Sequence, residues 1–199
     1  MRPPQTSINK QGITLDTSDR LHQIASMLID QTRARVIVPP QRHSTGHWFG
    51  GGNMVEDGDA SLWLVGRYRN QGDSRTGLGA GERGLELAIF RSTDRGKTFE
   101  KAVCFSKSDL NVGSREVLSI EGSALRMTDD GVELFVSTEK TGISYAAGLE
   151  SFLKPGTGVW TIDRIRAASI DGLPESTPQT ILESSDPRFV HIKDPFLGT

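Results

Sequence analysis

A weak internal repeat restricts the possible fold of this chain more than any other feature. Residues 51–58, with the sequence GGNMVEDG, precede the apolar run at residues 62–65. A second unit at residues 121–125 leads through the Asp-Asp-Gly of residues 129–131 to the apolar run at 134–136. Each unit has the pattern of a strand, an Asp-Gly hairpin turn and a second apolar strand. The chain is therefore predicted to be built from related β-hairpin units.

The spacing of these units is long and nearly constant. Gly52 and Gly122 are 70 residues apart, and Asp194 follows Gly122 by 72 residues within a third start at residues 191–197. β-Rich repeats of this length, with room for four strands, are typical of the blades of a β-propeller. A β-sandwich with two similar hairpins is the alternative architecture.

The rest of the sequence agrees with an all-β fold. Short β-rich runs are separated by clusters of Gly, Asp, Asn and Ser, and the 22 glycines suit many tight turns. Strands are predicted at residues 62–68, 85–91, 98–105, 117–127, 133–138 and 159–168. One short amphipathic helix is predicted at residues 18–31, because Leu21, Ile24 and Leu28 fall on one face at helical spacing.

These elements divide the chain into four segments. Residues 1–46 are predicted to form an N-terminal extension with the helix, 47–115 and 116–188 two four-stranded blades, and 189–199 the first strand of a third blade. The predicted fold is thus a partial β-propeller. A closed ring of four or more such repeats needs at least roughly 280 residues, so we expect the sequence to be a fragment of a longer protein. Self-association through open blade edges is the other way to complete a ring.

Composition limits the partners and the compartment. The net charge of −2 and the pI of about 6.1 imply no broad basic surface, so neither nucleic acid nor an anionic membrane is an expected partner. The single cysteine, Cys104, excludes an intrachain disulfide and is predicted to be a buried thiol, because it lies in an apolar run. Residues 1–5 show no apolar signal-peptide region, so cytoplasmic and secreted locations both stay open.

The most specific motif lies at residues 92–99, with the sequence STDRGKTF. It fits the pattern Ser-x-Asp-x-Gly-x-Thr-Phe, in which the Asp carboxylate accepts backbone N–H bonds across a turn and the Gly adopts a conformation that a Cβ resists. This pattern is the Asp-box, and on it the chain resembles the sialidase and neuraminidase-like β-propellers. The predicted structural residues of the motif are Ser92, Asp94, Gly96, Thr98 and Phe99.

The sialidase resemblance implies a glycoside hydrolase. In that family arginines bind the substrate carboxylate, and an Asp on a loop serves as acid and base. The resemblance makes Arg67 or Arg69 the carboxylate-binding residue and Asp73 the loop acid. The alternative for the two arginines is a solvated or salt-bridged strand face.

A second resemblance is to the five-bladed glycosidases, such as arabinanases, xylosidases and invertases. Those enzymes place acidic residues on the innermost strands of successive blades, where they converge on a central funnel. The corresponding positions here hold Asn53, Glu121 and Asp194, and residues 193–195 look like an Asp-Pro blade opening. Asn53 cannot act as a general base, so it is expected to bind substrate, and the acid–base pair is Glu121 with Asp194 or uses residues outside this sequence. Trp48, beside a glycine cluster, is predicted to stack on a sugar.

The sequence therefore predicts a glycoside hydrolase that acts on a terminal sugar of a glycan. The alternative is a non-catalytic carbohydrate-binding or scaffold propeller. No cofactor and no metal are expected, because the sequence lacks HExxH, CxxC and carboxylate–His clusters. Convergence of Glu121, Asp194 and Arg67 would favour the hydrolase, and side chains that point apart would favour the scaffold.

Overall fold

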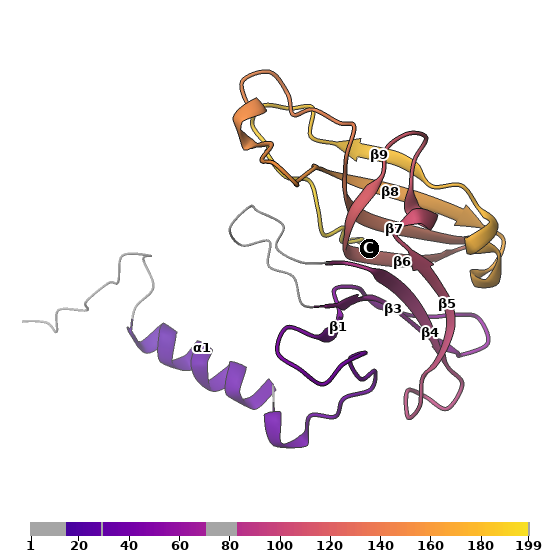
Figure 1. Cartoon of the computed structure of the whole chain (residues 1–199). Helices are drawn as coiled ribbons and strands as arrows, with labels where there is room; N and C mark the ends of the chain where they lie inside the picture. Colours follow the sequence, from indigo (N-terminus) through magenta and orange to yellow (C-terminus); the bar gives the residue numbers. More distant parts are fainter. Residues whose placement is uncertain (1–14, 29, 71–82, 199) are drawn as a thin grey trace, which may run out of the picture. The chain divides into compact units, whose positions relative to one another are not determined.

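The computed structural model describes residues 15–28, 30–70 and 83–198 (Figure 1). The chain divides into two compact units, Met1–Val36 and Ile37–Thr199. The first contains helix α1 (Leu15–Leu28) and the short 3₁₀ helix η1 (Gln31–Arg33). No helix within these ranges is long and apolar enough to cross a membrane.

Helix α1 is the short helix predicted from the sequence, but it begins three residues earlier than expected. Asp16 lies in its first turn, where a negative charge complements the helix dipole, and forms an i,i+4 ion pair of 3.7 Å with Arg20. The apolar stripe is not buried, since Leu21 and Ile24 are 52% and 54% exposed.

The second unit begins with an antiparallel sheet that we call sheet 1. Its five strands are β1 (Trp48–Gly50), β2 (Met54–Glu56), β3 (Leu62–Arg69), β4 (Glu86–Ser92) and β5 (Glu100–Ser106). Strands β1 and β2 both pair with β3, at opposite ends of its length, so they form one interrupted edge strand. Gly52 lies at the interruption, where an added Cβ would lie 2.0 Å from the Val65 carbonyl oxygen.

Sheet 2 is an antiparallel meander of four strands. They are β6 (Val117–Thr128), β7 (Gly131–Lys140), β8 (Val159–Ala167) and β9 (Gln179–Glu183). Among its described residues the second unit also contains the 3₁₀ helices η2 (Ser108–Leu110), η3 (Glu150–Phe152) and η4 (Ile170–Glu175). All six strand runs predicted from the sequence are formed, with ends displaced by at most two residues, whereas β1 and β9 were not predicted. The all-β prediction with one short helix is confirmed.

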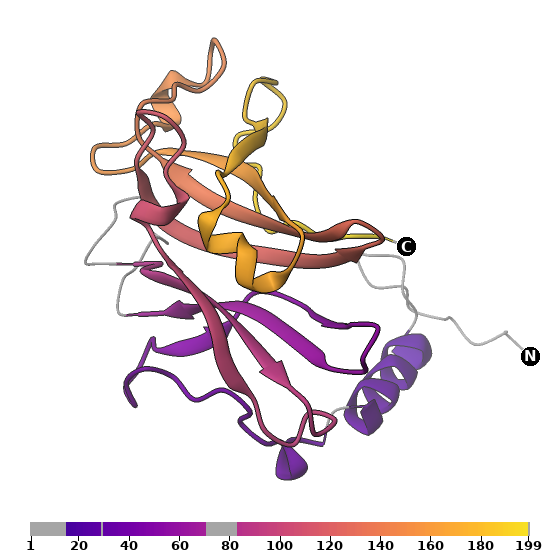
Figure 2. The same cartoon turned by 90° about the vertical axis from the view of Figure 1, so that its right-hand side faces the viewer.

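The main hydrophobic core lies between the two sheets (Figure 2). Sheet 1 contributes alternate residues of β3 and β4, among them Val65 and Ile89, and sheet 2 contributes residues such as Leu125 and Leu134. These four side chains are at most 1% exposed. The alternation of inward and outward side chains along each strand creates this shared apolar layer.

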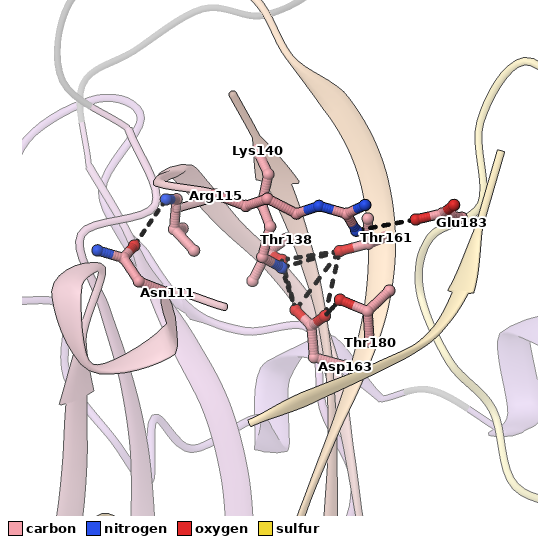
Figure 3. A network of polar contacts seen from close by, with 9 residues as sticks. Asn111, Arg115, Thr138, Lys140, Thr161, Asp163, Thr180 and Glu183 are labelled. Atoms are coloured by element: carbon pink, nitrogen blue, oxygen red, sulfur yellow. Dashed lines mark hydrogen bonds and ion pairs between the residues drawn. The ribbon is translucent and has the colours of Figure 1, made fainter. Parts of the chain in front are cut away.

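A buried polar network continues the inward-facing row of β7 beyond the apolar core (Figure 3). Lys140 and Asp163 are both 0% exposed and form an ion pair between β7 and β8. Lys140 Nζ also donates to Thr161 Oγ1 at 2.8 Å, and Thr138 and Thr180 donate to the Asp163 carboxylate at 2.8 and 2.7 Å. Burial lowers the pKa of Lys140, while the Asp163 carboxylate opposes that effect.

Residues 190–198, which we call the C-terminal segment, contain no strand. The prediction that residues 189–199 form the first strand of a further unit is therefore wrong for the described part of that range. Ile192 and Leu197 instead pack against a second apolar cluster of sheet 2, which includes Phe135 and Ile162. Side-chain packing and the polar contact of Asp194 described below attach this segment, without a backbone ladder.

The turn at residues 92–99 connects β4 to β5 and has the hydrogen bonds that its residue types predict. The Asp94 carboxylate accepts the backbone N–H groups of Lys97 and Thr98, both at 2.9 Å, and the Ser92 hydroxyl at 2.8 Å. These bonds lower the pKa of Asp94, with the backbone bond from Thr98 the largest cause. Gly96 has φ +78°, a left-handed conformation that a Cβ resists. Phe99 packs against the apolar cluster on the far face of sheet 1.

The prediction of a buried Cys104 is wrong, because its side chain is exposed. In β5 the neighbours Val103 and Phe105 are buried in the core, and Cys104 points to the other side of the strand. An apolar run does not bury every member when the strand has only one covered face.

Candidate functional site

Two predicted site residues from different sheets meet in a buried ion pair. Arg67 Nη2 on β3 lies 2.5 Å from Glu121 Oε2 on β6, and both side chains are 9% exposed. Ser119 Oγ also donates to Glu121 Oε1, at 3.3 Å. Burial lowers the pKa of Arg67, an effect that the Glu121 and Asp194 carboxylates oppose. The positively charged Arg69 adds to the lowering.

The Arg67 guanidinium is not saturated by its contact with Glu121. Its Nε and Nη1 atoms are buried and have no hydrogen-bond partner in the described part of the chain. Trp48, which is 43% exposed, lies against the guanidinium, with the Arg67 Cζ 5.0 Å from the centre of the indole ring. The described part of the chain therefore leaves two buried nitrogen donors of Arg67 unbonded next to Trp48.

Asp194 reaches the same site from the C-terminal segment. Its Oδ1 accepts the backbone N–H of Gly122 at 3.2 Å, directly after Glu121 in β6. Asp194 itself is exposed and has φ +57°. Arg67, Glu121 and Asp194 thus converge on one region, the arrangement that the sequence analysis linked to the hydrolase.

The same region contains hydrogen bonds that join the two sheets, and the bonded residues have a constant separation in the sequence. Asn53 bonds the backbone of Leu125 twice, donating to its carbonyl oxygen at 2.9 Å and accepting its N–H at 2.8 Å. The Ser123 N–H donates to the Gly51 carbonyl oxygen at 2.8 Å. The Asn53–Leu125 and Gly51–Ser123 pairs, like Gly122 with Asp194, are each 72 residues apart in the sequence. The Asn53 amide, expected to bind substrate, is occupied in joining the two sheets.

Of the two remaining predicted site residues, the structure describes Arg69 but not Asp73. Arg69 is half-buried at the end of β3 and acts electrostatically on Arg67, so it belongs to the surroundings of the site. Asp73, the predicted loop acid, lies outside the described residues. Among the residues that are described, no group of three or more His, Cys, Asp or Glu is arranged to hold a metal ion.

The sequence analysis missed a second buried pair beside this site. Glu139 on β7 is 2% exposed, accepts the Gly158 N–H at 2.7 Å, and lies 2.6 Å from Arg83 Nη2. Burial raises the pKa of Glu139, and the nearby Glu121 carboxylate raises it further. The Gly158 N–H and Arg83 oppose this rise. No sequence pattern marks Glu139, because it lies near the end of a strand and outside the repeated strand starts.

The site thus contains two carboxyl groups from adjacent strands, Glu121 and Glu139, each beside its own arginine. Pairs of carboxyl groups in different environments are the arrangement that general acid–base chemistry uses. Comparison with known proteins gives no family: no protein-family model matches the chain, and no curated protein matches it.

Proposed function

We propose that this chain supplies two blades of a β-propeller of the glycoside-hydrolase type, and that the protein hydrolyses a terminal sugar of a glycan. Two observations support the propeller. Both sheets are antiparallel meanders with sequential strands. The segment between β1 and β2 is joined to β6 by bonds between residues 72 positions apart, Gly51 with Ser123 and Asn53 with Leu125. Repeated four-stranded units whose first strands lie side by side are the arrangement of neighbouring propeller blades. The Asp-box at residues 92–99 is a further similarity to the sialidase group.

The observation that carries the proposal is the convergence of Arg67, Glu121 and Asp194 at the junction of those first strands. The two unpaired donors of Arg67 would bind an oxygen-rich group of the sugar, and Trp48 would pack against its ring. Glu121 and Asp194 would supply the two carboxyl groups that glycoside hydrolysis needs.

A non-catalytic carbohydrate-binding or scaffold propeller is the second candidate, and one observation favours it. The polar groups expected to act on substrate also hold the fold together: Asn53 bonds Leu125, Asp194 bonds Gly122, and Glu121 pairs with Arg67. A site built only to join blades would contain the same contacts.

The proposal is tested with nitrophenyl glycosides and reducing-end-labelled glycans, using the longest natural reading frame that contains this sequence. We expect turnover of at least one glycoside, and Glu121→Gln and Asp194→Asn should each lower kcat/KM by about 10²–10⁴-fold. Asp194→Asn keeps an Oδ1 acceptor for the Gly122 N–H, so this variant removes the charge of the carboxylate and retains the structural contact.

Glu133→Gln is the matched control. Glu133 is also a buried glutamate of sheet 2 paired with arginines, since Arg166 Nε donates to it at 2.5 Å and Arg126 Nε at 2.9 Å. It should change stability and leave kcat/KM unaltered. Glycan binding without turnover would establish the scaffold alternative, and absence of both would refute the carbohydrate proposal.

A further inference from the structure

A pocket beside the Arg67–Glu121 pair has features of a separate binding site. It has a volume of about 260 Å³ and lies at the outer side of β7 and β8, where the loop after β7 and the C-terminal segment border it. Its lining residues are Arg83, Glu139, Tyr145, Phe152, Lys154, Thr157, Gly158, Trp160, His191 and Lys193. This volume is just below the range of about 300–1,000 Å³ typical of drug-sized ligand sites, so the pocket fits a single ring.

The charge of the pocket differs in sign from that of the whole chain. Arg83, Lys154 and Lys193 bring three positive charges, and Glu139 is the one carboxylate among the lining residues. Glu139 is paired with Arg83 deep in the pocket. The two ammonium groups at the exposed rim are left as excess positive charge, although the full sequence has a net charge of −2. A positively charged concave site in a weakly acidic protein attracts anions.

Aromatic side chains form one wall of the same pocket. Tyr145 and Trp160 are 6% and 7% exposed, and the ring of His191 lies edge-on to both, with centroid distances of 6.2 and 6.4 Å. Lys193 Nζ lies 5.2 Å from the centre of the Trp160 ring. Burial and Lys193 lower the pKa of His191, so the imidazole is neutral near pH 7. Tyr145 and Trp160 therefore form a buried aromatic wall of the pocket, with the Lys193 ammonium beside the Trp160 ring.

We propose that this pocket binds a single sugar ring that carries one anionic group, with the ring against Trp160 and Tyr145 and the anion between Lys154 and Lys193. The anionic group is a carboxylate or a phosphate, because an ammonium group binds either as a point charge. This binding does not require Glu121 to be catalytic.

The test uses the 199-residue chain and four probes: glucuronate, glucose 6-phosphate, glucose and benzoate. Binding is followed by NMR through the indole N–H of Trp160, which Trp160→Phe assigns among the three tryptophans. We expect one anionic sugar to bind at least about tenfold more tightly than glucose and benzoate, since a hydrogen bond to a charged group is stronger than one between neutral groups. Comparison of glucuronate with glucose 6-phosphate distinguishes the two anionic groups.

Charge-removing variants test the position of the anion. Lys154→Ala and Lys193→Ala alter exposed side chains and should each weaken binding of the anionic sugar about tenfold, with little effect on glucose. Lys97→Ala, which removes the same charge from the exposed turn between β4 and β5, should have no effect. The proposal is overturned if charged and neutral sugars bind equally, if benzoate binds as tightly as the anionic sugar, or if neither anionic sugar binds saturably. Unaltered binding in both Lys154→Ala and Lys193→Ala would overturn it as well.

Discussion

Replacement of Lys140 by methionine should destabilise the protein strongly. The Asp163 carboxylate would then stay fully buried without its cation, and only hydroxyl donors such as Thr138 and Thr180 would remain (Figure 3). Methionine fills a similar volume, so the change tests the charge and leaves little cavity. The loss of one partner from a buried ion pair costs about 3–5 kcal/mol.

The expected loss is large relative to the whole stability of a domain, which is about 5–15 kcal/mol. For a domain of this size each kcal/mol lowers Tm by about 2–4 °C, so Lys140→Met should lower Tm by about 6–20 °C. The double variant Lys140→Met/Asp163→Leu should recover most of that loss, because apolar replacement of a buried ion pair is often neutral or stabilising. Thr138 and Thr161, whose hydroxyl oxygens are 3.2 Å apart, then bond each other.

The assay is urea unfolding followed by tryptophan fluorescence, together with a thermal scan by circular dichroism. Lys101→Met is the control, since Lys101 forms a 2.5 Å pair with Glu86 on sheet 1 while 38% of its side chain is exposed. It should cost at most about 1 kcal/mol. The reasoning fails if Lys140→Met also costs less than about 1 kcal/mol, or if the double variant is less stable than the single one.

Three further predictions concern the junction of the sheets and Glu139. Gly122→Ala would place a Cβ 2.5 Å from Asp194 Oδ1 and 2.9 Å from its Cα, so the C-terminal segment should be displaced and be cleaved faster in limited proteolysis; an unaltered cleavage rate would contradict this. Asn53→Ala leaves the N–H and carbonyl of Leu125 without their partner and should cost about 1–3 kcal/mol in urea unfolding, whereas Asn53→Asp, which keeps the acceptor, should cost less than Asn53→Ala. Burial raises the pKa of Glu139 above its ordinary value of 4.5. The stabilising contribution of Glu139 is therefore complete below about pH 4.5 and is lost as the pH rises through the pKa of the folded state. Glu139→Gln should therefore gain stability relative to the wild type as the pH rises from about 4 to 7, and a pH-independent difference would count against the assignment.

Much of the fold could be predicted because it follows from local pattern. Alternating apolar residues and the Asp-Gly turns placed strands β3 to β8 to within two residues. Strand β9 was missed because its apolar residues Ile181 and Leu182 are adjacent and partly exposed, so the segment shows no two-residue alternation. The C-terminal segment resembles a strand start in sequence, but its residues pack through side chains and Asp194 adopts a left-handed conformation.

The candidate site was predictable only where the repeat marked it. The register of the repeat pointed to Glu121 and Asp194, and the arginine-bearing strand pointed to Arg67, and these three meet in the structure. Glu139 and Arg83 were missed because their pairing joins residues 56 positions apart without any shared motif. The bonds between the Asn53 side chain and the Leu125 backbone could not be predicted either, because a side chain that bonds a distant backbone leaves no local sequence pattern.

The exposed thiol of Cys104 gives the molecule a natural attachment point. It is the single cysteine of the sequence, so a maleimide fluorophore would label one known position on β5 without any engineered substitution. The same thiol makes intermolecular disulfides the expected contaminant of samples stored in air, and a reducing agent should remove any covalent dimer.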